Sequence, residues 1–287
     1  MTDGESTTLG IIAGRGSLPL EIAKAASGTG RNVFILALQD HAEDCVVAEF
    51  PHKWVRLGQG GEALNALRTN GVKDLIFAGG VKRPSLLSLR PDFRAAKFLA
   101  KVGFRALGDD TLLRAIVREF EAEGFNILGS EDIWREAMMP AGQLTESAPD
   151  EQDWKDIARG VDVSQALGNV DVGHSVVVQQ GIVLAVEAVE GTDAVLQRAG
   201  QLLRDGGGGV LVKTAKPNQE MRIDLPAIGL TTVQNAVAAG LAGIAVEAGA
   251  AIFLDRNQAV AAANDAGLFM IGMDPTGLPA AAVSDEH

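Results

Sequence analysis

The chain has 287 residues, of which 47% are hydrophobic and 22% are charged, and this composition indicates a soluble globular protein of about two domains rather than a disordered one. Its formal net charge of −12 argues against non-specific binding to nucleic acid, whose phosphates require a basic face. A single cysteine excludes an intrachain disulfide and fits a reducing compartment, and the four histidines show no metal-ligand spacing.

Short apolar runs alternate with helical patterns through the first part of the chain. Strands are expected at 9–13, 33–38, 54–58, 74–80 and 125–129, and helices at 18–26, 62–71, 92–103 and 109–123. Strands that alternate with helices indicate a parallel sheet with crossover helices. Residues 1–130 are therefore predicted to form a Rossmann-like parallel-sheet domain.

The pattern changes after residue 130. Residues 131–162 gather proline, glycine and acidic residues and are interpreted as a linker or meandering connection. From 163 to 287 we expect a second, smaller α/β domain, with strands at 175–180, 182–189, 209–215, within 243–255 and at 268–273. Helices are expected at 191–203, 231–240 and 256–267.

Two segments bear on the membrane and on secretion. The start, MTDGESTTLGIIAG, is acidic before its first apolar run, unlike a signal peptide. Residues 236–254 are long enough to span a bilayer, but they consist mostly of alanine and glycine and carry Glu247. We interpret them as a helix, a glycine break and a buried strand, and we expect a cytoplasmic protein without a transmembrane helix.

Two glycine-rich turns follow predicted strands of the first domain. One contains Gly14, Gly16 and Ser17, and the other contains Gly79 and Gly80 followed by Lys82. Ligands bind parallel sheets at the carboxyl ends of the strands, so both turns are candidates for phosphate binding. Ordinary tight turns with solvated side chains explain the same residues. Leu18-Pro19 stands where a dinucleotide fingerprint has its third glycine, which argues against a Rossmann oxidoreductase.

The second domain carries a charged turn after a predicted strand. Lys213, Lys216, Arg222 and Asp224 surround Pro217, which suits either a solvated hairpin end or a pocket for a phosphorylated ligand.

Further polar residues flank the neighbouring strands. Glu187 interrupts an apolar strand and needs a partner, and Gln180 ends another. Thr192 and Asp193 start a helix, where they either cap it or form an anion site. Hard oxygen ligands next to cations suit Mg²⁺ and a pyrophosphate.

Several stretches resemble a known family. IAGRGSLP, FAGGVKRP, LGDDTLL, VVVQQGIVLAVEAVEGTDA, GGVLVKTAKPNQEMRIDLPAIGLTTV and GLAGIAVEAG are similar to the UDP-2,3-diacylglucosamine pyrophosphatases of lipid A biosynthesis, the type unrelated to calcineurin-like phosphoesterases. The resemblance covers nearly the whole chain and is weakest over 130–170. It implies a two-domain, Mg²⁺-dependent enzyme of Gram-negative bacteria that hydrolyses UDP-2,3-diacylglucosamine to 2,3-diacylglucosamine 1-phosphate (lipid X) and UMP.

The resemblance also guides the expected site. The essential aspartate of the family matches Asp224, which would position the metal or the attacking water. From their chemistry we expect Lys213 and Arg222 to be catalytic as well, and Glu187 and Asp193 to bind the metal with Asp224. The expected substrate-binding residues are Gly14, Gly16, Ser17, Gly79, Gly80, Lys82, Gln180, Thr192, Lys216 and Gln219. A non-catalytic nucleotide-sugar or lipid-binding module and a Rossmann oxidoreductase remain as alternatives.

A basic stretch suggests where the protein meets its lipid-linked UDP-sugar. Residues 82–105 have one acid, Asp92, and the bases Lys82, Arg83, Arg90, Arg94, Lys97, Lys101 and Arg105. Apolar residues lie among these bases, which is typical of an interfacial helix on anionic headgroups, although packing onto the sheet explains the same pattern. We expect peripheral association with the cytoplasmic side of the inner membrane, and a homo-oligomer is left open.

Overall fold

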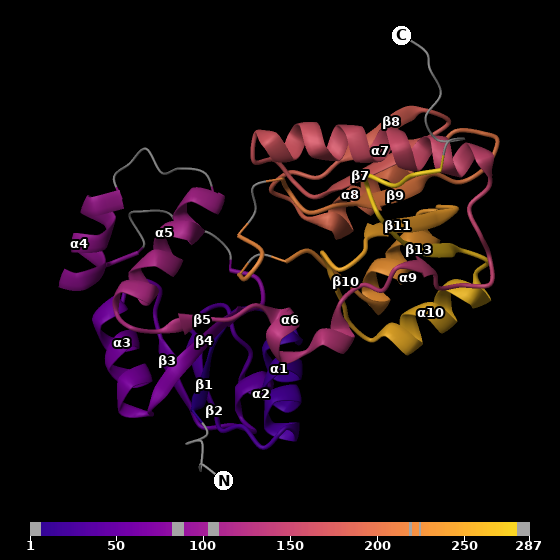
Figure 1. Ribbon diagram of the computed structural model, residues 1–287. Coiled ribbons are helices and arrows are strands. Elements are labelled where there is room, and N and C mark those ends of the chain that lie inside the picture. Colours follow the sequence, from indigo (N-terminus) through magenta and orange to yellow (C-terminus); the bar gives the residue numbers. More distant parts are fainter. Residues whose placement is uncertain (1–6, 82–88, 103–108, 218–219, 224, 280–287) are drawn as a thin grey trace. The chain divides into compact units, whose positions relative to one another are not determined.

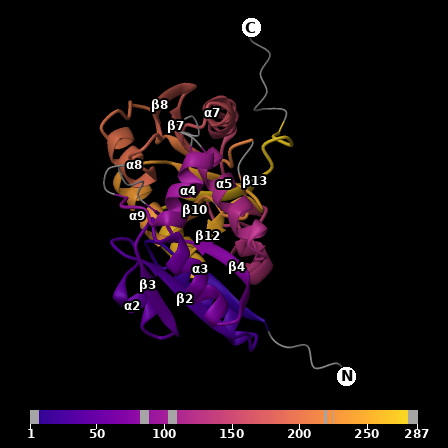
Figure 2. The same cartoon turned by 90° about the vertical axis from the view of Figure 1, so that its left-hand side faces the viewer.

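The computed structural model describes residues 7–81, 89–102, 109–217, 220–223 and 225–279 (Figure 1). The chain forms two compact units. The first is Met1–Glu136 together with Glu220–Ile223, and the second is Ala137–Gln219 together with Asp224–His287. Each unit contains a main sheet with helices packed on it, so the predicted two-domain α/β class is confirmed (Figure 1 and Figure 2).

The first unit has a parallel sheet in the order β3-β2-β1-β4-β5. The strands are β1 (Thr8–Ala13), β2 (Val33–Leu38), β3 (His52–Val55), β4 (Val72–Ala78) and β5 (Asn126–Ile127). The order reverses between β1 and β4, and their carboxyl ends mark the position where doubly wound folds bind ligands. β3 begins earlier than predicted because it is an edge strand whose polar residues His52 and Lys53 interrupt the apolar pattern.

Both faces of this sheet are covered. Phe34, Leu36 and Leu38 of β2 belong to the core on one face, and the alternate residues of β2 belong to the core on the other. Side chains of a strand point alternately to its two faces, so a doubly covered strand reads as a continuous apolar run. The helices of the unit are α1 (Leu18–Gly28), α2 (Asp44–Val47), α3 (Gly60–Thr69), α4 (Phe93–Val102), α5 (Asp109–Ala122) and α6 (Ser130–Ile133), with the 3₁₀ turn η1 (Arg135–Ala137) at the boundary.

The second unit has a mixed sheet in the order β6-β13-β11-β9-β7-β8. Its strands are β6 (Gly142–Gln143), β7 (Ser175–Gln179), β8 (Ile182–Val186), β9 (Val210–Lys213), β11 (Gly243–Glu247) and β13 (Phe269–Met273). β9, β11 and β13 are parallel, whereas β7 is antiparallel to both β8 and β9. A small parallel pair, β10 (Ala227–Ile228) and β12 (Ile252–Phe253), stands beside it, with α8 (Thr192–Gly200), α9 (Leu230–Ala238) and α10 (Arg256–Asp265).

The structure corrects the expected connection at 131–162. A long helix, α7 (Glu151–Asn169), begins inside it, and Asp150 caps this helix by accepting the Asp153 amide at 2.9 Å. Ile157 and Val161 pack into the core with β9, so α7 belongs to the second unit, which is therefore not the smaller one, whereas residues 131–136 belong to the first. The acidic residues that read as a loop are the N-terminal capping residues of a helix.

The apolar segment 236–254, which is long enough to span a bilayer, is interrupted as expected. α9 ends at Ala238, a turn at Gly240 with φ 77° follows, and β11 begins at Gly243. Among the described residues, no helix is both long and apolar enough to cross a membrane.

Candidate functional site

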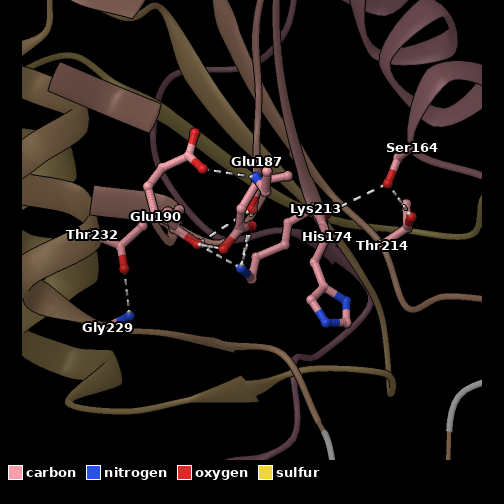
Figure 3. A network of polar contacts seen from close by, with 11 residues as sticks. Ser164, His174, Glu187, Glu190, Lys213, Thr214, Gly229 and Thr232 are labelled. Carbon is pink, nitrogen blue, oxygen red and sulfur yellow. Dashed lines mark hydrogen bonds and ion pairs between the residues drawn. The ribbon is translucent and has the colours of Figure 1, made fainter. Parts of the chain in front are cut away.

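A polar cluster lies at the edge of the second sheet where β9 ends (Figure 3). Because β7 is antiparallel to β9 and to β8, β7 begins and β8 ends at this same edge. The register places Ser175 opposite Lys213, and the Glu187 amide donates to the Ser175 carbonyl at 2.8 Å. Thr192, the first residue of α8, reaches the same place. Ser175, Glu187, Thr192 and Lys213 are called the Lys213 cluster below.

The ammonium group of Lys213 is the centre of this cluster. Lys213 is only 4% exposed, and its Nζ donates to Thr192 Oγ1 at 2.7 Å and to Ser175 Oγ at 3.0 Å. Glu187 Oε2 lies 3.6 Å from the same nitrogen. A buried ion pair seldom stabilises a protein more than apolar residues of the same volume would. Its presence at a strand end therefore points to a functional role.

Glu187 is held in its ionised form. Burial by itself would raise the pKa of this carboxyl, but the charge of Lys213 and the hydroxyls of Ser175 and Thr192 outweigh it and lower the pKa below the ordinary value. Thr192 Oγ1 donates to Glu187 Oε1 at 3.2 Å. At neutral pH the cluster is thus a pair of opposite charges bridged by two hydroxyls.

The residues that follow β9 are fixed from three sides. Thr214 Oγ1 lies 2.7 Å from Ser164 Oγ of α7, and the Thr214 amide donates to the His174 carbonyl at 3.1 Å (Figure 3). The Ala215 amide donates to Glu247 Oε2 of β11 at 2.9 Å. Lys216 Nζ then pairs with Asp171 at 2.7 Å. This bonding places the cation of Lys216 three residues beyond that of Lys213 on a well-supported backbone.

The two glycine-rich turns of the first unit meet at the carboxyl ends of β1 and β4. The Arg15 amide donates to the Gly80 carbonyl at 2.8 Å, and the Gly80 amide donates to the Arg15 carbonyl at 3.2 Å. A Cβ atom on Gly14 would lie 2.5 Å from the Gly80 oxygen, and one on Gly79 would lie 2.4 Å from the Arg15 oxygen. Glycine is therefore required there by the approach of two backbones. Gly16 and Ser17 follow at the start of α1, where a Cβ on Gly16 would meet nothing within 4 Å.

Arg222 does not join the Lys213 cluster among the described residues. It belongs to the first unit, where its guanidinium contacts Glu220 and Glu121.

Comparison with known proteins assigns the chain to a family. The family model for the LpxI N-terminal domain matches residues 8–137, and the model for the LpxI C-terminal domain matches residues 140–271. The chain is 42% identical over 278 residues to the UDP-2,3-diacylglucosamine pyrophosphatase LpxI of Caulobacter vibrioides, covering 94% of this chain and 99% of the relative.

The chain belongs to the LpxI family. The boundary between the two matched LpxI domains, at residues 137–140, lies close to the boundary between the two structural units, at Glu136 and Ala137.

The structure brings together some of the residues predicted for an LpxI site and separates others. Thr192 joins Lys213 and Glu187, as described. Gln180 lies in the turn at the other end of β7, where its amide donates to Asp156 and its side chain to the carbonyls of Asp205 and Gly206. That position is opposite to the Lys213 cluster, because β7 begins at one edge and ends at the other. The expected Asp224, Gln219 and Lys82 lie outside the described residues.

Of the three expected metal ligands, Glu187 and Asp193 are among the described residues, and both already have partners. Glu187 is engaged by the Lys213 ammonium, which would repel a bound cation. Asp193 Oδ1 accepts the Asn235 amide at 2.8 Å on an exposed surface. Over the described part of the chain, no three His, Cys, Asp or Glu side chains are grouped to hold a metal ion. Glu187 and Asp193 therefore do not fit the role of shared Mg²⁺ ligands in this LpxI chain.

Sequence reasoning missed two members of the site. Ser175 was hidden because a single serine at a strand start carries no pattern of its own. Glu247 was noted only as an obstacle to a membrane span, yet it ends β11 one residue after Val246, the register partner of Lys213, and it accepts the Ala215 amide. Burial raises the pKa of the Glu247 carboxyl, the Ala215 amide partly opposes this rise, and Asp274 adds to it. A carboxylate that closes an apolar run at the carboxyl end of a strand was the signal available.

Proposed function

We propose that this protein hydrolyses the pyrophosphate bond of UDP-2,3-diacylglucosamine to 2,3-diacylglucosamine 1-phosphate and UMP, in lipid A biosynthesis. The observation that carries the proposal is the 42% identity, along 94% of the chain, to a relative named for this substrate. Both family domains are present, so the similarity is not limited to a shared binding module.

The Lys213 cluster suits this chemistry. In the hydrolysis, the oxygen of water forms a bond to one phosphorus, and the bond from that phosphorus to the bridging oxygen breaks. The bridging oxygen leaves with the electron pair, and the water proton passes to a base. Negative charge grows on the phosphate oxygens in this step, and preorganised cations stabilise it. Lys213 and Lys216 are such cations, and each is oriented by a partner from another segment of the second unit, Thr192 for Lys213 and Asp171 for Lys216.

Asp224 and magnesium complete the proposal. Asp224 matches the family's essential aspartate and would orient or deprotonate the water. Mg²⁺ commonly binds through one or two carboxylates together with the phosphates of the substrate, so it does not require a preformed cage. When bound, it would neutralise pyrophosphate charge. No step is assigned to Glu187 or Asp193 as ligands.

The proposal is tested by following UMP release from detergent-dispersed UDP-2,3-diacylglucosamine, with and without EDTA. We expect UMP from the wild type, strong inhibition by EDTA that added Mg²⁺ reverses, and a folded Asp224→Ala protein that still binds substrate but loses most turnover. Binding without UMP from the wild type would indicate a non-catalytic module instead. Normal turnover by Asp224→Ala would overturn the assignment of this residue.

We further propose that α4 contacts an anionic membrane surface and that the protein reaches its lipid substrate through this peripheral contact. Phe93 is 89% exposed, and Lys97 and Lys101 are exposed at positions four and eight residues further along the same helix. Such spacing places the three side chains on one side of the helix. An exposed aromatic ring among lysines is typical of interfacial helices.

A further inference from the structure

The second half of the sequence contributes a short piece to the first unit. Residues Glu220–Ile223 belong to the first unit, although the chain before and after them belongs to the second. This piece lies in the connection that leaves β9 at Lys213 and reaches β10 at Ala227. The connection therefore contains residues of both units.

An apolar contact and an ionic contact attach this piece. Ile223 packs, with Phe77 and Phe120, against the core that covers one face of the first sheet. Arg222 binds both carboxylate oxygens of Glu220, with Nε–Oε1 at 2.8 Å and Nη2–Oε2 at 3.0 Å. Its remaining Nη1 donates to Glu121 Oε1 of α5 at 2.8 Å.

The guanidinium group is thus occupied by two carboxylates. The fork of Arg222 matches Glu220 bidentately, and such planar pairs fix geometry better than a lysine can. Hydrogen bonds from Arg222 lower the pKa of Glu220, and Arg114 of α5 acts in the same direction. Arg114 and Glu121 are seven residues apart, two turns along α5, so they face the piece from one side of that helix.

We propose that Arg222 is a positioning residue rather than a catalytic cation, and that its contact with Glu121 anchors the β9–β10 connection to the first unit. The inference rests on the proposed function, because this connection carries Lys216 and the aspartate that matches the essential one of the family. Ile223 immediately precedes Asp224, and neighbouring Cα atoms are about 3.8 Å apart. We therefore expect a change at the anchor, residues 222–223, to affect the contribution of this aspartate to turnover.

The anchor is tested with two glutamates of the same helix. Glu121→Ala removes the α5 partner of Arg222, whereas Glu119→Ala, two residues away on α5, removes an ion pair with Lys101. In the detergent-dispersed UMP assay we expect kcat to fall about 10-fold for Glu121→Ala with little change in KM, since a displacement near 1 Å can cost up to about 100-fold. Glu119→Ala is expected to retain wild-type kcat and KM.

A double-mutant cycle separates an anchor from a catalytic cation. Arg222→Lys keeps the positive charge but loses the fork, and we expect it to lose about as much kcat as Glu121→Ala. Adding Glu121→Ala to Arg222→Ala should change kcat no further, because both remove one interaction. If Arg222→Ala abolishes turnover while Glu121→Ala and Arg222→Lys behave as wild type, Arg222 acts on the substrate and the proposal is wrong.

A readout without substrate keeps the anchor testable if the proposed function fails. Limited thermolysin digestion is followed by the appearance of fragments cut within 217–226. We expect cleavage there to become several-fold faster in Glu121→Ala than in Glu119→Ala or the wild type, since protease access follows local opening. Absence of UMP from the wild type would refute the activity alone, whereas equal cleavage rates would refute the anchor. If Glu121→Ala does not fold, Glu121→Gln replaces it in both measurements.

Discussion

At the scale of single residues, the candidate site is built around the buried ion pair of Lys213 and Glu187. The two opposite charges compensate one another, and the hydroxyls of Ser175 and Thr192 contribute hydrogen bonds. Removing one charge therefore leaves the other buried without the opposite charge that balanced it. Stability and function can therefore be separated by removing one charge or both.

Removing one charge of the pair should destabilise the protein, and removing both should not. We expect Glu187→Gln to lower the free energy of unfolding by about 3 kcal/mol, because the buried Lys213 ammonium then loses the negative charge of Glu187 beside it. The double variant Glu187→Gln, Lys213→Met should lie within about 1 kcal/mol of the wild type but form no UMP. Urea denaturation and the UMP assay measure the two quantities.

The pH dependence and a surface control sharpen this prediction. The pKa of Glu187 is lowered on folding, so the stability it contributes is present above the ordinary carboxyl pKa of about 4.3 and is lost as the pH falls below it. The difference in the free energy of unfolding between the wild type and Glu187→Gln should therefore become smaller at acidic pH. Glu190→Gln, which loses an exposed ion pair with Arg198, should change stability little. A double variant as unstable as Glu187→Gln would contradict the pairing argument.

At the scale of elements, the membrane proposal depends on helix α4. The contacts of this helix limit which basic residues of 82–105 are available to anionic lipids. Arg94 pairs with Glu123 and Lys101 with Glu119 of α5, so part of the basic charge of 82–105 is balanced within the first unit. Asp92 accepts the amides of Gly61 and Ala95 and so holds the helix start beside α3. Phe93 and Lys97 are then the side chains of α4 best suited to reach a lipid surface.

Replacing Phe93 should weaken attachment to anionic vesicles without unfolding the protein. We expect Phe93→Ala to reduce the fraction that floats with phosphatidylglycerol-containing liposomes at low salt several-fold, because the ring contributes apolar area that a lysine stem does not. Val189→Ala, at a fully exposed apolar residue of the second unit, is the matched control and should float as the wild type does. Equal flotation of all three proteins would exclude α4 as the lipid-binding face.

At the scale of the whole molecule, the two structural units do not correspond to two continuous halves of the sequence, because residues 220–223 belong to the first unit. Cutting the chain at residue 136 would leave the first unit without Ile223, which packs against its core. Trp54 lies in the first unit and Trp154 in the second, so single-tryptophan variants can report on each unit separately.

Shortening Ile223 should therefore destabilise the first unit. We expect Ile223→Ala to lower the free energy of unfolding reported by Trp54 by about 1–2 kcal/mol. This is less than the usual cost of an Ile→Ala change in a core, because Ile223 is only partly buried. The unfolding reported by Trp154 should change less, although Ile223 is nearer to it in the sequence. Chemical denaturation followed by fluorescence measures both, and a loss confined to Trp154 would contradict the division of the chain.

By itself, the sequence determined the features that depend on local pattern. The buried strands β1, β2 and β4, the crossover helices and the two-domain α/β class follow from apolar runs and turn residues, because both faces of a doubly covered sheet demand apolar side chains. The long family-like blocks pointed to the enzyme family, since their length makes chance similarity improbable. Helix α7 was missed because a capping box of acids resembles a loop.

Only the tertiary structure decided which residues share a site. Lys213, Ser175 and Thr192 come from three separate elements and Glu187 directly follows a fourth, β8, and only the antiparallel entry of β7 beside β9 brings their side chains to one edge. The same geometry sends Gln180 to the opposite edge and gives Arg222 to the first unit. Spacing along a chain fixes the face on which a side chain stands, whereas strand direction and the return path of a loop depend on how distant segments pack.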